Sequence, residues 1–368
     1  MTHTSKSPQL RLGDSELDLH LEVSSNMPLD LPLGSRILTA AVSGPSQPTP
    51  KRRPHSIRRT STLDIDWPKG MSESARVRGD ARDLLTGSSD SHVRVLNQGW
   101  IEVHIGPERV YESLSTAPEH TSLQRVVGVP RSQASRKIVA QLVPEESYEG
   151  SPLFLLLDDL PGIYLASGEV MLEWSSVKQL KSVSGVREQM PRDVCAGYER
   201  SSSAFLPDGS SAATHQVQAV QELTRADDQQ AWHTLLPEIV VASMRRARRI
   251  DVWLDGELHI DAFFQDSCMT PSGVRVGVHE YTLRVVADPS SGEILLIDAD
   301  PRILPFDECP GAAKNIDRIL GMHLHDLRSV VPRTLSGTIG CTHLNDMLRS
   351  LTDVPGLVQE MSEEPSAI

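Results

Sequence analysis

The stretch IDVWLDGELHIDAFFQDS, residues 250–267, decides the fold class. Apolar residues alternate in both of its arms, and the arms meet at Asp255-Gly256, which is a strong hairpin signal. Another alternating arm, HEYTLRVVA at 279–287, is joined by a DPSSG turn to EILLIDAD at 293–300. Because each arm turns back on the one before it, the sequence predicts an antiparallel sheet of hairpins.

Two helices are expected after these strands. The first opens at Cys309-Pro310, since proline is favoured in the first turn of a helix, and it stops at Gly321. The second begins at Cys341 or Thr342 and ends at Pro355-Gly356. Apolar residues recur at helical spacing in both segments. The C-terminal third is therefore expected to be α+β, with helices covering an antiparallel sheet.

Upstream of the hairpins, the segments at 52–68, 75–86 and 92–106 also alternate and are expected as strands. The middle of the chain is harder to interpret. GSPLFLLLDDLPG, residues 150–162, is expected as a buried strand, and residues 217–249 as one or two helices. No internal repeat is visible.

The expected organisation has five parts. They are a disordered N-terminal segment rich in Ser, Pro, Thr and Gly at 1–50, a β segment joining the core sheet at 51–106, an inserted α/β region at 107–247, an α+β core at 248–356, and a tail at 357–368. The whole chain is expected to be α+β, a mainly antiparallel sheet of hairpins with C-terminal helices and a large central insertion.

Composition narrows the functional classes. The chain has 368 residues and a formal net charge of −13, and only 4% of its residues are aromatic. These values argue against nucleic-acid binding and against attraction to anionic membranes. No apolar run is long enough to span a bilayer and no signal-peptide core is present, so a cytoplasmic location is expected. Four cysteines in so long a chain are expected as thiols or metal ligands.

The cysteines and histidines of the last third indicate a metal site formed by His279, Cys309, Cys341 and His343. Both cysteines fall at expected helix N-termini, where the helix dipole favours the thiolate that binds metal. His279 lies on the apolar face of its strand. Two thiolates and two imidazoles would suit zinc or iron. The alternative is that the cysteines are buried small apolar residues and the histidines are hydrogen-bonded core residues.

A basic cluster near the first strand, Arg52, Arg53, Arg58 and Arg59, could hold a small anionic ligand. The alternative is a solvated strand edge on which charges discourage aggregation. A second cluster, at 245–249, is expected to solvate a helix end. The chain has no Walker A loop, no GxSxG and no GxGxxG sequence, so no nucleotide cofactor is expected.

Two stretches resemble known families. LPFDECPGAAKNIDRILG followed by GTIGCTHLNDMLRSL, together with RRPHSIRRTSTLDID near the start, resembles the bacterial family called domain of unknown function 2889. This resemblance covers roughly residues 51–105 and 250–355 and implies no function. The C-terminal order of ligand strand, hairpin and Cys-initiated helix is similar to the iron–sulfur scaffold (NifU-like) architecture. That second resemblance implies ligands at His279, Cys309 and Cys341 or His343. It departs from the scaffold pattern because His279 replaces the first cysteine.

Three functions are therefore open. The first is a metal-dependent enzyme acting on a small organic acid or thioester, with Asp266, Glu280 or Asp307 as its base. The second is an accessory or metal-scaffold protein that supports a partner enzyme. The third is a non-catalytic binding module in which the cysteines are merely buried.

Overall fold

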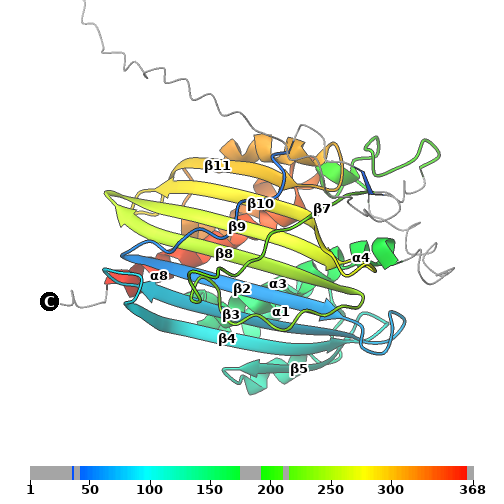
Figure 1. Cartoon of the computed structure of the whole chain (residues 1–368), viewed down its shortest axis with the longest axis horizontal. Helices are drawn as coiled ribbons and strands as arrows, with labels where there is room; N and C mark the ends of the chain where they lie inside the picture. Colours follow the sequence, from blue (N-terminus) through cyan, green and yellow to red (C-terminus); the bar gives the residue numbers. More distant parts are fainter. Residues whose placement is uncertain (1–34, 37–41, 175–191, 210–214, 363–368) are drawn as a thin grey trace, which may run out of the picture. The chain divides into compact units, whose positions relative to one another are not determined.

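The computed structural model describes residues 35–36, 42–174, 192–209 and 215–362. Within them, one open antiparallel sheet of nine strands dominates, with the order β11-β10-β9-β8-β2-β3-β4-β5 and β7 against β10 (Figure 1). The strands are β2 (Ser56–Asp66), β3 (Ala75–Thr86), β4 (Val93–Ile105), β5 (Tyr111–Ala117), β7 (Gln218–Ala219), β8 (Ser243–Asp255), β9 (Glu257–Met269), β10 (Arg275–Ala287) and β11 (Ile294–Ile303). The α+β class and the predicted hairpins are confirmed. A separate parallel pair joins β1 (Ser35–Arg36) to β6 (His215–Gln216).

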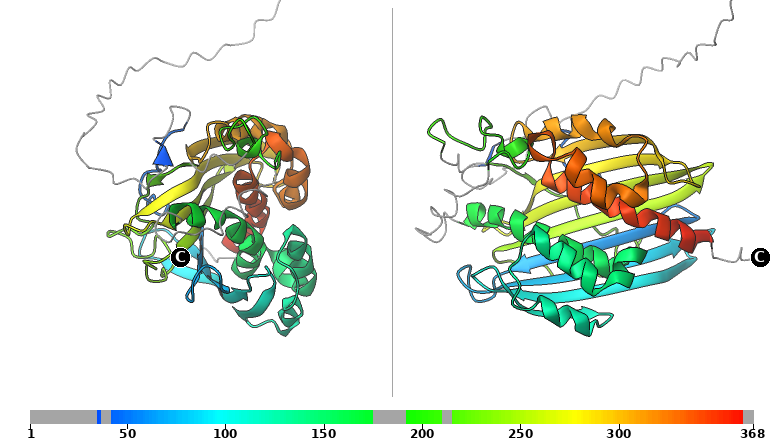
Figure 2. Two further views of the ribbon diagram at one scale, coloured as in Figure 1. Left: turned by 90° about the vertical axis from the view of Figure 1, so that its right-hand side faces the viewer. Right: turned by 180° about the vertical axis from the view of Figure 1, so that it is seen from behind.

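The main helices cover one face of this sheet (Figure 2). The helices after β5 are η1 (Thr121–Val126), α1 (Gln133–Leu142), α2 (Pro144–Glu149), α3 (Pro152–Ala166) and α4 (Gly168–Trp174), followed later by η2 (Ala196–Tyr198). The helices after β11 are η3 (Cys309–Ile319), η4 (Leu324–Asp326), α6 (Leu327–Thr334), η5 (Gly337–Ile339), α7 (Thr342–Ser350), η6 (Leu351–Asp353) and α8 (Val354–Ser362). No helix in these described ranges is both long and apolar enough to cross a lipid bilayer.

The fold contains a repeat that the sequence did not reveal. β2–β5 and β8–β11 are both four-stranded meanders, they meet at the β2–β8 pair, and each is followed by helices. In each half a 3-10 helix is followed by a glycine with positive φ, Gly128 and Gly321. Later in each half a glycine precedes the N-cap residue of a helix, which is Ser151 for α3 and Cys341 for α7. The two halves are thus built to one plan.

The segment 150–162 forms a helix, so the prediction of a buried strand there was wrong. Ser151 caps α3 by accepting a hydrogen bond from the Phe154 amide, and Pro152 lies in the first turn. Almost every described side chain of α3 is buried, because the helix packs across β2, β3 and β4. A helix buried on all sides has no polar stripe, and its sequence then looks like that of a buried strand.

The prediction of helices over 217–249 was also wrong. This stretch begins with β7, continues without regular structure across the sheet face opposite the helices, and enters β8 at Ser243. The arginines at 245–249 therefore lie on a central strand and are buried. The basic run looked like a solvated helix end because charged side chains are rarely buried without partners.

Both ends of the chain differ in part from the expectation. Residues 42–50, expected to be disordered, lie on the sheet face opposite the helices. There the Ser43 amide donates a hydrogen bond to the Pro301 carbonyl, and Thr49 is buried. The rest of the expected 1–50 segment lies outside the described residues, apart from β1. Near the C-terminus, α8 continues through Pro355-Gly356 to Ser362. The last predicted helix is therefore split into α7, η6 and α8, and the tail from 363 lies outside the described residues.

Two large apolar cores lie between the sheet and the helices. One packs α6, α7 and η3 against β8–β11, and the other packs α1 and α3 mainly against β2–β5. Residues 107–247, expected as an inserted region, supply β5, α1 and α3 to this arrangement.

We predict that Leu156→Ala lowers the free energy of unfolding of the whole chain by about 2–5 kcal/mol, because it leaves a cavity between α3 and the sheet. Leu156 is fully buried, whereas Leu165 on the same helix is 48% exposed and supplies the matched control, Leu165→Ala. Urea unfolding followed by circular dichroism measures both changes. Equal, small effects for the two variants would show that α3 does not belong to the cooperative core.

Candidate metal centre

One carboxylate and two imidazoles converge under the helix layer. A carboxylate oxygen of Asp266 and ring nitrogens of His279 and His343 all lie within 4.8 Å of one another, and all three residues are buried. Asp266 and His279 are direct cross-strand partners of β9 and β10. The pairing depends on a register shift between Gly277 and His279, where Val278 is the extra residue. His343 reaches the same point from the first turn of α7.

The two imidazoles are stacked and uncharged. Their ring centroids are 3.4 Å apart and their planes differ by 18°. Burial, followed by the nearness of His343, holds the pKa of His279 well below its usual range. Burial and the charge of Arg246 lower the pKa of His343 to about 3. Neutral imidazole is the form that binds metal, and the buried His279 Nδ1 has no hydrogen-bond partner in the part of the chain that is described.

Asp266 is held in place by Arg246. The Arg246 Nε and Nη2 atoms donate to the two Asp266 oxygens at 2.9 and 2.8 Å. Arg246 Nη1 donates a hydrogen bond to Asp346 on α7 at 3.0 Å. The Asp266 Oδ2 atom also lies 3.5 Å from His343 Nε2. A bidentate Arg–carboxylate pair fixes the plane of the carboxylate. Asp266 can therefore bind a metal only through the oxygen lone pairs that do not accept hydrogen bonds from Arg246.

These contacts belong to a buried ion-pair seam between the two apolar cores. Its members, defined here and used below under this name, are Arg136, Asp158, Asp159, Arg246, Arg248, Asp266, Asp346 and Arg349. The four arginines and four aspartates balance in charge. Burial works against the ionised form of Asp346, but Arg136 and Arg246 outweigh it and hold its pKa below the usual value.

Of the two predicted cysteine ligands, only Cys341 lies beside the histidine pair in the described residues. Cys341 Sγ is 3.9 Å from His343 Nδ1, whereas Cys309 Sγ lies against Gly197 and Phe306 at the start of η3. Burial raises the pKa of both thiols, which opposes the stabilisation of thiolates expected at helix N-termini. Neither cysteine joins a group of three or more ligands within 4.8 Å among the described residues. Cys195, which the sequence did not place near the site, contributes to the raised pKa of Cys309.

The two other proposed bases lie elsewhere. Glu280 is on the opposite face of the sheet, where it accepts hydrogen bonds from Gln265 and from the Ser46 amide. Asp307 precedes η3 and accepts a hydrogen bond from Gln216. Asp266 is the one of the three that contacts the histidine pair. The β9–β10 turn at residues 270–274 sets the register of these two strands. A one-residue bulge in that register then places Asp266 opposite His279.

The four arginines of the predicted anion site do not converge. Arg52 binds both oxygens of Asp228, and Arg58 binds both oxygens of Asp251 on the face opposite the helices. Arg59 points to the helix face and is bound by Asp83 and Asp353. Arg53 lies over the ring of Trp253 at 4.3 Å. Anion binding by these four residues stays a prediction, although three of them already hold carboxylates of the chain.

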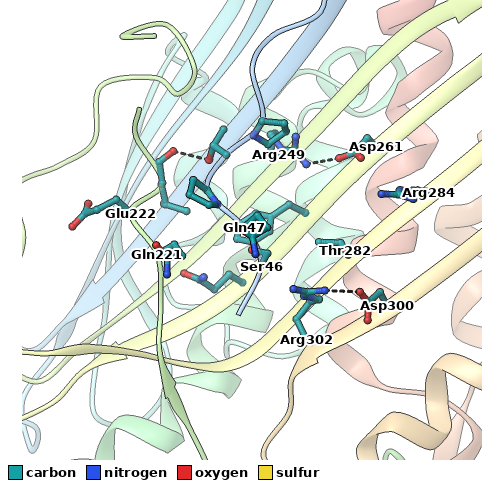
Figure 3. Close-up of a pocket in the computed structure, with 16 residues that line it drawn as sticks. Ser46, Gln47, Gln221, Glu222, Arg249, Asp261, Thr282, Arg284, Asp300 and Arg302 are labelled. Carbon is teal, nitrogen blue, oxygen red and sulfur yellow. Dashed lines mark hydrogen bonds and ion pairs between the residues drawn. The ribbon is translucent and has the colours of Figure 1, made fainter. Parts of the chain in front are cut away.

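A cavity of about 250 Å³ lies on the sheet face opposite the helices (Figure 3). Figure 3 shows Ser46 and Gln47 lying over this sheet face, with Arg249 paired to Asp261 and Arg302 paired to Asp300. Besides these two ion pairs, the lining of the cavity includes the charged side chains of Arg284 and Glu222. The cavity is separated from the histidine pair by the sheet, so it does not take part in the candidate metal centre.

Residues 244–356 match the family model described as Protein of unknown function (DUF2889). The match begins in β8 and ends in α8, so it contains Asp266, His279, Cys309, Cys341 and His343. It supports the C-terminal part of the resemblance and does not extend to residues 51–105. No curated protein and no solved structure showed a significant match to the chain.

We predict that Arg246→Met lowers the free energy of unfolding by about 3–5 kcal/mol, because it leaves buried aspartates without a counter-charge. The control is Arg200→Met, which breaks an ion pair whose arginine side chain is 75% exposed, and only a small change is expected. Guanidinium unfolding monitored by tryptophan fluorescence compares the two. If Arg246→Met were as stable as Arg200→Met, the seam would not support the fold.

A second prediction concerns pH. Burial raises the pKa of Asp158 from 3.8 to about 6, despite the opposing charges of Arg136 and Arg328 and with help from Asp159 and Asp346. The folded state therefore binds this proton more tightly than the unfolded chain. The resulting stabilisation is complete below pH 4 and is lost as the pH rises through 6. We expect wild type to lose about 1–3 kcal/mol more than Asp158→Asn between pH 4 and pH 7, measured by urea unfolding. Parallel pH profiles would contradict this.

Proposed function

We propose that the chain is a metal-dependent enzyme whose ion is held by Asp266, His279 and His343. The observation that carries this proposal is the convergence of one carboxylate and two neutral imidazoles on a single buried point. Two histidines and a carboxylate are a ligand set that leaves positions open and suits iron or zinc. Cys341 lies next to His343 and would be available as a further ligand once deprotonated by the metal.

A metal in this position would polarise a carbonyl or activate a water molecule, which fits chemistry on a small organic acid or thioester. Arg246 would act on the metal through Asp266, since its two hydrogen bonds fix the carboxylate. The burial of all three ligands favours an enzyme over the accessory or NifU-like scaffold function, because a scaffold must present its metal to a partner.

The competing interpretation is a metal-free ion-pair core within a binding module. It is favoured by one observation, namely that both oxygens of Asp266 are already bound by Arg246. In that case His279 and His343 would serve only as packed aromatic rings. The two interpretations differ in the metal content of the purified protein.

We predict close to one equivalent of zinc or iron in protein purified without added metal, and loss of most of it in His279→Ala and His343→Ala. The matched control is His259→Ala, because His259 lies on β9 and stacks on Trp253, away from the three ligands. Inductively coupled plasma mass spectrometry measures the content, and circular dichroism verifies that the variants fold. Cys341→Ser tests the thiol separately and should reduce metal content less than the histidine variants do.

Metal-free wild-type protein that also fails to take up Zn²⁺ or Fe²⁺ would overturn the proposal. So would equal metal content in His279→Ala and His259→Ala. The first result would favour the metal-free binding module, and the second would show that the metal is held elsewhere in the chain.

A further inference from the structure

The cavity of about 250 Å³ on the sheet face opposite the helices has a floor of strands and a cover of irregular chain (Figure 3). Outward-facing residues of β8, β9, β10 and β11 make the floor, and the segments 46–50 and 221–223 cover it. The floor lies within residues 244–356, which match the family model, whereas both covering segments lie outside that match. The cavity is therefore built jointly by the family domain and by the parts of the chain that precede it.

The covering segments are held in place by hydrogen bonds. The Ser46 amide donates to the Glu280 carboxylate at 2.5 Å. The Thr49 hydroxyl joins the two segments, because it donates to the Leu223 carbonyl at 2.7 Å and accepts a hydrogen bond from the Trp232 indole at 2.8 Å. A site whose walls are already ordered loses less conformational freedom when a ligand binds.

One cation on the floor has no ionic partner in the part of the chain that is described. Arg249 is paired with Asp261, and Arg302 is paired with Asp300. Arg284 lies between these pairs on β10, its side chain is exposed, and it forms no hydrogen bond or ion pair with another described residue. Because the guanidinium is exposed, a ligand that enters the cavity can reach its donor atoms.

Two further carboxylates near the cavity do not take up this guanidinium. Asp298 lies opposite Arg284 on β11, but it is not part of the lining and no ion pair joins the two side chains. Glu222 is exposed and lies on the other side of the covering segment from Arg284 (Figure 3). Arg284 is therefore available to an anionic group of a ligand.

The other accessible groups of the lining are largely polar. Gln47 and Gln221 offer exposed amides, and Thr282 offers a half-buried hydroxyl beside Arg284 on β10. The floor residue Phe263 is only 7% exposed. An apolar ligand body would remove water from these polar groups without replacing their hydrogen bonds. Hydroxyl groups both donate and accept, so they match amides and hydroxyls in either orientation.

We propose that this cavity binds a sugar acid, which is a small polyhydroxylated monocarboxylate, with its carboxylate on Arg284 and its hydroxyls on Gln47 and Thr282. A guanidinium can bind both oxygens of a carboxylate through two parallel hydrogen bonds. The cavity is smaller than the roughly 300–1,000 Å³ of sites for drug-sized ligands, which suits a ligand of this size. The inference goes beyond the proposed function, because the sheet separates this cavity from the candidate metal ligands.

The test is isothermal titration calorimetry of the full chain with sodium gluconate at low ionic strength, where charge interactions at exposed sites are screened least. Sorbitol, which has hydroxyls but no carboxylate, and hexanoate, which has a carboxylate but no hydroxyls, are titrated in parallel with inorganic phosphate. Arg284→Gln removes the exposed charge. Arg318→Gln is the matched control, because Arg318 is also exposed but lies on η3, on the helix side of the sheet.

Saturable gluconate binding is expected in wild type, with a Kd about tenfold weaker in Arg284→Gln and unchanged in Arg318→Gln. Sorbitol and hexanoate are each expected to bind at least about tenfold more weakly than gluconate. The inference would be overturned by absence of saturable gluconate binding, by equal Kd values in the two variants, or by sorbitol, hexanoate or phosphate binding as tightly as gluconate.

The metal centre is tested separately in the same proteins. His279→Ala should bind gluconate with the Kd of wild type, and Arg284→Gln should retain the metal content of wild type. Failure of the sugar-acid site and failure of the metal centre are therefore distinguishable.

Discussion

The buried ion-pair seam fixes how the two halves of the fold meet. Arg246 and Arg248 leave β8 toward the helices and are bound by Asp159 of α3 and Asp346 of α7. α3 belongs to the first half and α7 to the second, so a shift of either helix would separate charges that no water can solvate. Directional hydrogen bonds between charged groups tolerate little sliding, as in the Arg248 Nη2 atom, which donates to both Asp159 oxygens at 2.9 and 2.7 Å. The seam therefore fixes the position of the helices on the sheet. It thereby also fixes the position of His343, which α7 carries to Asp266 and His279.

The repeat explains why the candidate metal ligands lie in one half. After its capping residue, α3 begins with Pro152-Leu153, where α7 begins with Thr342-His343. The first half fills this position with apolar core, and the second half brings an imidazole to Asp266 and His279. The family match covers the second half alone. The first half still contributes Arg136, Asp158 and Asp159 to the seam, so it completes the surroundings of the site.

β2, β3, β4, β9, β10 and β11 were predicted from their period-two alternation, whereas β5, β7 and the first half of β8 were not. The faces of β10 were assigned correctly, with His279 and Tyr281 toward the core. α3 was not predictable from periodicity because it is buried all round. The arginines of β8 were misread because several of their partners lie far away in the chain, such as Asp64 for Arg245 and Asp159 for Arg248. Of the candidate metal centre, the two histidines could be named from the sequence. Asp266 could be named only as a base, since a bulge at Val278 decides that it faces His279.

The seam also determines how strongly a metal could be held. A carboxylate bound on both oxygens by a guanidinium offers less electron density than a free one, so Asp266 would be a weak ligand beside two strong imidazoles. Arg246 also forms ion pairs with Asp159 and Asp346, and these pairs weaken the interaction of Arg246 with Asp266.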